Sequence, residues 1–590
     1  MPQITRCFDL LSFYRESFGN KPDMYGAKVD GQWKTWSADE CISIIHDLAS
    51  GLINAGVKKS DRVGIMSPSR PEWNFTDFAI QLCGAVSVPV YPNLSEQDLA
   101  FVIKDAGLVA FLTDTQALAS KVAHGAEQAG LHLKIYTFEK AEGFPQYTEL
   151  TESGKRNPQT DTINELKQNT DPQTLLTLLY TSGTTGTPKG VMLTHHNLVS
   201  NFTTLCELPP VDHTSRALSF LPLNHIYERM LSYLYLFRGP SIYYAESIEK
   251  VGDNIREVKP HMFTCVPRLV EKVYDRIIAK GEELTGIKRK LFFWAVDLGE
   301  QFDIPEKRSW WYNFKLRIAS AIIFKKWREA LGGNVRAMVS GGAALNVRLA
   351  KIFWAAGIPV LEGYGLTETS PVIAVNTLEP GNMFFGTVGP VVRNGAVKFG
   401  PDGEILFKGP NVMKGYWNRP DATAEVMDAD GFFHTGDIGE LVNGKYLKIT
   451  DRKKEIFKTS QGKYIAPQRI ENMLCASRFI EQAMIVGEGE KFAAALVIPA
   501  FAFVKEWAVR KKLNIGTTNA EIASNPQVKA RIMEEVETAN KNLANYEQIK
   551  TIALIERPFS VDTGELTPKL SLKRKVVCKN YEAEIASLFS

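Results

Sequence analysis

Short apolar runs alternate with amphipathic stretches along the first part of the chain. Residues 27–36 show strand-like alternation around an Asp-Gly pair and predict a β-hairpin. A capping-box pattern at Ser37 and apolar residues at helical spacing predict a helix that closes at Gly56. Buried-strand patterns at 62–67 and 109–114, with helical patterns around them, predict an α/β fold with a doubly wound parallel sheet.

Two later stretches depart from this alternation. Residues 150–173 are strongly polar, and we interpret them as a surface connection. Residues 218–225 begin with an apolar run and predict a strand that ends on His225. A lone histidine is more often structural than functional. Ligands of open α/β sheets nevertheless bind beyond the carboxyl ends of the strands, so His225 is a candidate functional residue.

A ten-residue segment at 181–190, rich in glycine and hydroxyl side chains, lies between two apolar runs. It contains three glycines, five serine or threonine residues and one lysine. Glycine lets backbone N–H groups approach an anion closely, hydroxyls add donors, and lysine adds a positive charge. The flanking strand patterns argue against a flexible linker, so the segment predicts a polyphosphate-binding loop. Its predicted binding residues are Thr181, Ser182, Gly183, Thr184, Thr185, Gly186, Thr187 and Lys189.

The Walker A phosphate loop does not fit this segment. That motif needs a glycine directly before its lysine and a hydroxyl residue directly after it. Here Pro188 precedes Lys189 and Gly190 follows it. A kinase built on the Walker motif is therefore disfavoured. The nucleotide product decides between the two, because a kinase would release ADP from ATP.

Two further strand patterns open into residues suited to a nucleotide. The run at 338–345 leads into small residues, which leave room for a flat ring. The run at 360–368 ends in an aromatic ring that can stack on a purine, a hydroxyl for a phosphate oxygen, and a carboxylate for Mg²⁺. Taken alone, any one glutamate is usually a solvated surface charge. The candidate residues are Gly341, Gly342, Ala343, Tyr364, Gly365, Thr367 and Glu368.

These motifs resemble those of the adenylate-forming enzymes, a family that includes acyl-CoA synthetases and firefly-type luciferases. Residues 180–190 (YTSGTTGTPKG) resemble its phosphate loop, and 364–368 (YGLTE) resemble its adenine and magnesium motif. Residues 435–437 (TGD) are similar to its ribose motif, and 451–455 (DRKKE) to its interdomain hinge. Residues 266–276 resemble a segment of long-chain acyl-CoA synthetases in particular.

The resemblance implies a role for each matching residue. Glu368 and Thr184 would hold Mg²⁺, His225 would lie near the acyl carboxylate, and Asp437 and Arg452 would contact the ribose. Asp451 would be the pivot, with Lys458 and Gly462 lining a channel for the CoA thiol. Many members of the family carry a catalytic lysine directly after a glycine, but here Glu565 follows Gly564. The long-chain variant of the motif fits better and places this lysine at Lys573, with Lys569 as the alternative. The implied catalytic residues are Lys573, Glu368, Thr184 and His225.

The same resemblance implies a fold and a reaction. Residues 1–450 would form a large α/β domain of two doubly wound layers and a distorted β-barrel, and 451–590 a small α+β lid. The reaction would be the ATP- and Mg²⁺-dependent activation of a long-chain fatty acid to acyl-AMP, followed by transfer to coenzyme A. Activation of an aryl or shorter acid, delivery of acyl-AMP to a carrier protein, and a membrane-bound fatty acid carrier without catalysis remain as alternatives.

Residues 276–333 form an insertion in which aromatic and basic residues are interleaved. This composition suits a membrane interface. It also suits an ordinary helical insertion whose lysine stems cover apolar surface, the interpretation that we favour. Peripheral membrane attachment and a homodimer are left as options.

The overall composition narrows the partners and the compartment. The chain has 69 basic and 66 acidic residues among 590, so its net charge of +3 gives no reason to expect a nucleic-acid partner. Its seven scattered cysteines suit free thiols in a reducing compartment. The N-terminus does not have the pattern of a secretory signal, and we see no apolar run of membrane-spanning length. We therefore expect a cytoplasmic protein.

Overall fold

The computed structural model describes residues 4–181, 187–304, 308–453, 455–560, 563–567 and 572–589. The chain forms two compact units. Unit 1 comprises Met1–Lys398, Leu406–His434 and Leu441–Lys448, and unit 2 comprises Phe399–Ile405, Thr435–Glu440 and Ile449–Ser590. Within the described ranges, no helix is both long and apolar enough to cross a bilayer.

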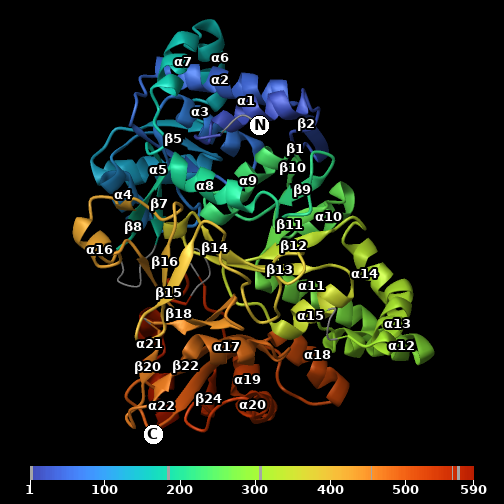
Figure 1. Ribbon diagram of the computed structural model, residues 1–590. Helices are drawn as coiled ribbons and strands as arrows, with labels where there is room; N and C mark the ends of the chain where they lie inside the picture. Colours follow the sequence, from blue (N-terminus) through green and yellow to red (C-terminus); the bar gives the residue numbers. More distant parts are fainter. Residues whose placement is uncertain are drawn as a thin grey trace. The chain divides into compact units, whose positions relative to one another are not determined.

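The first sheet of unit 1 has seven strands in the order β17-β8-β7-β4-β3-β5-β6 (Figure 1). The strands from β7 to β6 are parallel, whereas β8 is antiparallel to both β7 and β17. The predicted buried strands at 62–67 and 109–114 are confirmed as β3 and β5. The strands are β3 (Arg62–Met66), β4 (Val86–Pro89), β5 (Leu108–Thr113), β6 (Lys134–Thr137), β7 (Leu175–Thr181), β8 (Lys189–Thr194) and β17 (Gly415–Tyr416).

The second sheet of unit 1 has eight strands in the order β14-β13-β12-β11-β9-β10-β1-β2. Its central strands are parallel, and the predicted hairpin at 27–36 is confirmed as the antiparallel pair β1–β2 at one edge. The strands are β1 (Tyr25–Val29), β2 (Gln32–Trp36), β9 (Arg216–Ser219), β10 (Ser241–Tyr244), β11 (Met262–Cys265), β12 (Ala337–Ser340), β13 (Val360–Gly365) and β14 (Val372–Val375).

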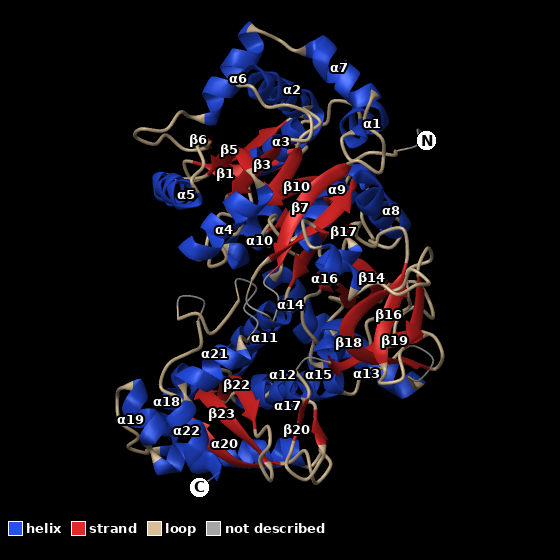
Figure 2. Ribbon diagram, turned by 90° about the vertical axis from the view of Figure 1, so that its left-hand side faces the viewer, coloured by secondary structure: helices blue, strands red, loops and turns tan. Residues whose placement is uncertain are grey.

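Helices flank both sheets, as Figure 2 shows by colour. The predicted capping box is confirmed, because the Ser37 side chain accepts from the Glu40 backbone N–H while the Glu40 carboxylate accepts from that of Ser37. The helices of unit 1 are α1 (Asp9–Phe18), α2 (Ala38–Asn54), α3 (Pro71–Leu82), α4 (Glu96–Ala106), α5 (Gln116–Ala129), α6 (Tyr147–Arg156), α7 (Thr160–Gln168), α8 (His195–Leu205), α9 (Ile226–Arg238), α10 (Val251–Val258), α11 (Pro267–Glu282), α12 (Gly286–Glu300), α13 (Trp310–Ala319), η2 (Ser320–Phe324), α14 (Lys325–Ala330), α15 (Val347–Ala355), η3 (Thr367–Thr369) and α16 (Pro420–Ala424).

The polar stretch at 150–173 is mostly exposed, as expected of a surface connection, and it is helical over most of its length. Helix α6 packs on α2, and both views of the molecule draw them side by side. A Cβ on Gly154 would lie 1.9 Å from the backbone oxygen of Asp47, and one on Gly51 would lie 2.0 Å from that of Leu150. The two glycines therefore allow a close helix crossing, and this packing outweighs the polar composition of α6.

The strand predicted to end on His225 is also shorter than expected. Strand β9 ends at Ser219, and a loop leads from there to the start of α9. Pro222 lies in that loop, and its missing N–H cannot join a sheet ladder. His225 is therefore the N-cap of α9 rather than the last residue of a strand.

Unit 2 contains an α+β core. Strands β22, β23 and β24 form a three-stranded sheet, and their apolar residues join those of α17, α18 and α20 in one buried cluster. A separate hairpin pairs β20 with β21. The elements are β20 (Phe457–Lys458), β21 (Tyr464–Ile465), α17 (Pro467–Cys475), β22 (Ile480–Val486), β23 (Ala493–Pro499), α18 (Phe501–Lys511), α19 (Asn519–Ser524), α20 (Pro526–Asn540), β24 (Ile549–Leu554), α21 (Arg574–Asn580) and α22 (Glu582–Phe589).

A further sheet has four strands in the order β15-β16-β18-β19. The α/β class, with a large N-terminal and a small C-terminal part, is confirmed. The strands are β15 (Ala396–Phe399), β16 (Glu404–Lys408), β18 (Phe433–Val442) and β19 (Tyr446–Arg452).

Candidate active site

The predicted phosphate loop joins two antiparallel strands of unit 1. Thr181, the last residue of β7, pairs with Lys189, the first residue of β8, so the segment between them is the connection of a hairpin. Thr187 is exposed at its end. Residues 182–186 lie outside the described residues, and the roles predicted for Ser182, Gly183, Thr184, Thr185 and Gly186 stay predictions.

The short edge strand β17 brings a tyrosine to this hairpin. Tyr416 pairs with Val191 of β8, and its ring centroid lies 5.2 Å from the Nζ atom of Lys189. The Tyr416 hydroxyl donates a hydrogen bond to Glu368 Oε1 at 2.9 Å. Burial, and then the neighbouring carboxylate, raise the pKa of Tyr416, so the phenol remains a protonated donor at neutral pH. One side chain thus links the predicted phosphate-loop lysine to the predicted magnesium ligand.

The donor set around Glu368 fits a magnesium ion shared with a nucleotide. Within the described ranges, no group of three or more His, Cys, Asp or Glu side chains is arranged to hold a metal by itself. Mg²⁺ commonly takes one or two carboxylates and completes its shell with substrate phosphates and water. A single half-exposed carboxylate near the hairpin that is predicted to bind phosphate meets that requirement.

The predicted adenine residues lie at the ends of two neighbouring parallel strands. Gly341, Gly342 and Ala343 follow β12, while Tyr364 and Gly365 end β13, which pairs with β12. Parallel neighbours bring their carboxyl ends to the same edge of the sheet, so the structure places these two groups together. Thr367 is buried in the short 3-10 helix η3 that follows.

Gly365 also has a packing role that its sequence motif does not reveal. A Cβ at this position would lie 1.8 Å from the backbone oxygen of Pro371, because β14 folds back antiparallel along β13. Only glycine fits that approach. Its predicted contact with a nucleotide stays a prediction.

Beside these residues lies a buried carboxyl group that sequence reasoning missed. Glu362 of β13 is 8% exposed, and burial raises its pKa to about 8 even though the backbone N–H of Leu345 donates to it. The group is therefore mostly protonated at neutral pH. No pattern in the sequence separates this glutamate from an exposed one, because its burial depends on the neighbouring strands.

His225 is held in a defined orientation by the start of α9. Its Nδ1 atom accepts a hydrogen bond from the backbone N–H of Tyr227 at 3.0 Å. A neutral imidazole that accepts at Nδ1 carries its proton at Nε2, so that atom is a donor. The Tyr227 hydroxyl in turn donates to the backbone oxygen of Val339 in β12 at 3.1 Å, which connects α9 to the second sheet.

A buried polar network supports β7, the strand that leads into the phosphate hairpin. Arg229 of α9 pairs with Asp77 of α3 at 2.5 Å, and neither side chain is exposed. The guanidinium also donates to Thr177 of β7 and to Ser87 of β4, each at 2.8 Å. Tyr233 donates a further hydrogen bond to Asp77. The network connects α3 and α9 to the first sheet.

Unit 2 carries the residues predicted to contact the ribose. Arg452 Nε lies 3.6 Å from Asp437 Oδ1. Asp451, the predicted pivot, is 4% exposed, and its Oδ1 accepts from the backbone N–H of Arg452 at 2.6 Å. Burial raises the pKa of Asp451 to about 6. The structure places Asp437 and Arg452 together, and the pivot role remains a prediction.

The residues predicted to line a thiol channel lie on the β20–β21 hairpin of unit 2. Lys458 pairs with Tyr464 across the two strands, and its Nζ lies 5.0 Å from that ring. Gly462 occupies the turn with φ +78°, a conformation that favours glycine, and open space surrounds the position of a Cβ. A ligand could therefore approach the backbone closely there.

The basic cluster near the C-terminus divides into a structural residue and a candidate catalytic one. Arg574 pairs with Glu471 at 2.6 Å and with Glu455 at 3.3 Å, which fixes the start of α21. Lys573, the N-cap of α21, is half-exposed, and its backbone N–H donates to Glu565. The alternative, Lys569, lies outside the described residues.

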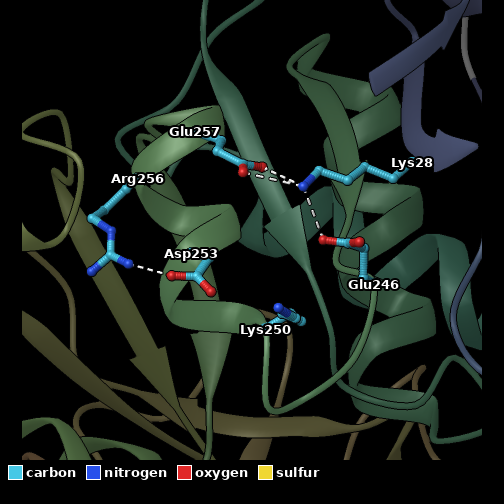
Figure 3. Close-up of a pocket in the computed structure, with 6 residues that line it drawn as sticks. All are labelled: Lys28, Glu246, Lys250, Asp253, Arg256 and Glu257. Atoms are coloured by element: carbon cyan, nitrogen blue, oxygen red, sulfur yellow. Dashed lines mark hydrogen bonds and ion pairs between the residues drawn. The ribbon is translucent and has the colours of Figure 1, made fainter. Parts of the chain in front are cut away.

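A surface depression of unit 1, shown in Figure 3, is lined mainly by paired charges. Lys28 Nζ lies 3.0 Å from Glu246 and 2.8 Å from Glu257, and Arg256 pairs with Asp253. Its carboxylates and cations largely neutralise one another, so it contributes no candidate catalytic group.

Comparison with known proteins gives the family. The model of the AMP-binding enzyme family matches residues 15–417, and that of the AMP-binding enzyme C-terminal domain matches residues 454–590. The chain is 34% identical to the long-chain-fatty-acid–CoA ligase FadD15 of Mycobacterium bovis, over 96% of this chain and 94% of that protein. It is 33% identical to the peroxisomal long chain acyl-CoA synthetase 6 of Arabidopsis thaliana, over 96% and 82%.

A solved structure supports the fold. The adenylation domain of a carboxylate reductase from Mycobacterium chelonae superposes with a TM-score of 0.76 at 21% identity, covering 100% of this chain and 92% of that one. The sequence motifs, the fold and these matches agree: the chain belongs to the family of AMP-binding enzymes.

Proposed function

We propose that this protein is a long-chain fatty acid–CoA ligase that forms AMP. The observation that supports the proposal is the linkage of Lys189, Tyr416 and Glu368, which would join a phosphate-binding hairpin to a magnesium ligand. Relatives of that name, similar along nearly the whole chain, support the choice of substrate. ATP, Mg²⁺, coenzyme A and a fatty acid are the implied ligands.

The first half-reaction activates the acid. A carboxylate oxygen of the fatty acid attacks the α-phosphorus of ATP, the bond from that phosphorus to the β-bridging oxygen breaks, and pyrophosphate leaves. The hairpin between Thr181 and Lys189 would hold the outer phosphates. Mg²⁺, held by Glu368 and with Thr184 as the predicted second ligand, would supply positive charge to the phosphates. Lys573 would offset the charge that develops between the carboxylate and the α-phosphate.

The second half-reaction transfers the acyl group to coenzyme A. The thiol sulfur attacks the acyl carbon, its proton passes to water, and AMP leaves with the oxygen of the broken anhydride bond. In our proposal, the lid of residues 451–590 turns about Asp451, which withdraws Lys573 and brings Lys458 and Gly462 to the thiol. Asp437 and Arg452 would keep hold of the ribose.

A pyrophosphate-release assay with acids of increasing chain length tests this function. We expect release that depends on a long-chain acid, AMP rather than ADP as the nucleotide product, and a thioester when CoA is present. A preference for aryl or short acids would show that the substrate is another class of carboxylic acid. Acyl-AMP that reacts only with a carrier protein would show that the acyl acceptor is that protein and not coenzyme A. Absence of acid-dependent pyrophosphate release would overturn the proposal and favour a non-catalytic fatty acid carrier.

A further inference from the structure

Helix α13 and the π-helix η2 that follows it expose a stripe of large apolar side chains. Trp310, Trp311 and Phe314 are 76%, 52% and 45% exposed. The Phe314 ring stacks on both tryptophans, with centroid distances of 6.1 and 5.5 Å. Ile318 and Ile322, 38% and 48% exposed, continue the stripe at a spacing of four residues, which keeps them on one side of the helix. These five residues are called the aromatic face below.

The aromatic face is not part of the packing that holds the insertion together. Phe292, Phe324 and Trp327 are nearly fully buried in the core of unit 1 and account for that packing. Tyr312 lies on the other side of α13, where its hydroxyl donates to the backbone oxygen of Leu298 at 2.8 Å and fastens α13 to α12. The insertion is thus ordinary protein core on one side and exposed aromatic surface on the other.

Basic residues lie on the same helical segment as the aromatic face. The segment from α13 to α14 contains five basic residues and a single acidic one, Glu329. Arg317, Lys325 and Lys326 are exposed, and the Nζ atom of Lys315 lies 5.5 Å from the ring of Trp311. Within unit 1, Figure 1 draws α12, α13 and α14 close together, to the right of strands β12 and β13. The Nζ atom of Lys325 lies 3.9 Å from Glu329, but both side chains are more than half exposed, so the basic side chains remain accessible to anionic groups that approach this surface.

We propose that the aromatic face docks on an anionic lipid bilayer. The tryptophan and phenylalanine rings enter the headgroup region, while the lysine and arginine side chains contact lipid phosphates. Tryptophan is suited to this depth because one edge of the indole is apolar and the other carries an N–H donor. The excess of positive charge selects an anionic bilayer over a neutral one. This inference does not depend on the reaction proposed above.

Co-sedimentation of the full-length protein with lipid vesicles tests the proposal. We expect binding to vesicles of phosphatidylcholine mixed with phosphatidylglycerol, weaker binding as salt is added, and little binding to phosphatidylcholine alone. The double variant Trp310→Ser/Phe314→Ser should lower the affinity for mixed vesicles by at least about tenfold. Lys325→Glu/Lys326→Glu should lower it by a similar factor, since each basic residue near a bilayer contributes roughly fivefold.

Two matched controls separate the aromatic face from general effects of polarity and charge. Ile248→Ser changes an apolar side chain that is 67% exposed elsewhere on unit 1. Lys104→Glu/Lys140→Glu reverses two exposed lysines outside the insertion and changes the net charge equally. Both controls should bind mixed vesicles as the wild type does.

Three results would overturn the proposal. One is a wild-type protein that ignores mixed vesicles or binds neutral vesicles equally well. The second is an unchanged affinity of Trp310→Ser/Phe314→Ser for mixed vesicles. The third, read by analytical ultracentrifugation, is a wild-type dimer that this double variant converts to a monomer, because the aromatic face would then be the interface between two copies. Acid-dependent pyrophosphate release measured without lipid reports separately on the proposed function.

Discussion

The buried ion pair between Arg229 and Asp77 leads to a prediction about how the phosphate hairpin is supported. The variant Arg229→Met keeps much of the side-chain volume but removes the guanidinium that contacts Asp77, Thr177 and Ser87. Both members of the pair are 0% exposed, so water does not replace the lost contacts. The variant leaves the Asp77 carboxylate buried without its cation.

The structure sets the expected size of this effect. Breaking a fully buried pair from one side costs about 3–5 kcal/mol. With an unfolding entropy of about 2 cal/mol/K per residue over the length of unit 1, that cost corresponds to a fall in Tm of roughly 4 °C. The matched control Arg256→Met breaks a pair with Asp253 whose side chains are 58% and 49% exposed, and exposed pairs contribute about 0–1 kcal/mol.

Scanning calorimetry of the ligand-free protein measures these differences. The double variant Arg229→Met/Asp77→Asn removes the uncompensated charge and should recover at least about half of the loss seen in Arg229→Met. Equal Tm values for Arg229→Met and Arg256→Met would refute the reasoning. The single variant Asp77→Asn completes the comparison. The reasoning would also be refuted if the fall in Tm of the double variant equalled the sum of the falls for Arg229→Met and Asp77→Asn.

Three further predictions concern the site. Tyr416→Phe removes the donor to Glu368 but keeps the ring beside Lys189, so acid-dependent pyrophosphate release at limiting Mg²⁺ should fall roughly five- to tenfold, and an unchanged rate would break the proposed link. Lys573→Ala should abolish acyl-AMP formation yet spare thioester formation from supplied acyl-AMP; if Lys569→Ala behaves this way instead, Lys569 is the catalytic lysine. In the folded protein, burial raises the pKa of Glu362 to about 8, compared with about 4.3 in an unfolded chain. Between these two pH values the folded state binds more protons than the unfolded state, so the folded protein loses stability as the pH rises through this range. The Tm of Glu362→Gln should therefore fall less between pH 5 and pH 9 than that of the wild type, and parallel Tm curves would contradict the assignment.

Features with a local cause could be predicted from the sequence. The hairpin at 27–36 needs only its turn and its alternation, and the capping box needs only Ser37 and Glu40. The strand-end positions of Tyr364 and Gly341 follow from apolar runs that stop at small or polar residues. These patterns survive in the folded protein because the neighbouring segments do not compete with them.

Features that depend on distant packing could not be predicted. Tyr416 lies in a two-residue strand with no periodicity, and only its pairing with β8 brings it to Lys189. The composition of 150–173 is that of a loop, but Gly154 allows α6 to pack closely against α2. In the same way, whether an aromatic residue of the 276–333 insertion is buried or exposed depends on which side of its helix packs against the core.

The pairing of β17 with β8 has a consequence for the order in which the site forms. Residues 191 and 416 meet at the edge of the first sheet, so a growing chain carries β8 as an open edge until Gly415 and Tyr416 have been synthesised. Contacts between such distant residues must overcome the entropy of closing a long loop, and they form late in folding. The edge of the predicted phosphate-binding hairpin is thus completed only after nearly all of unit 1 has been synthesised. A nascent or truncated chain that ends before β17 would expose a strand edge and lack the tyrosine that positions Glu368.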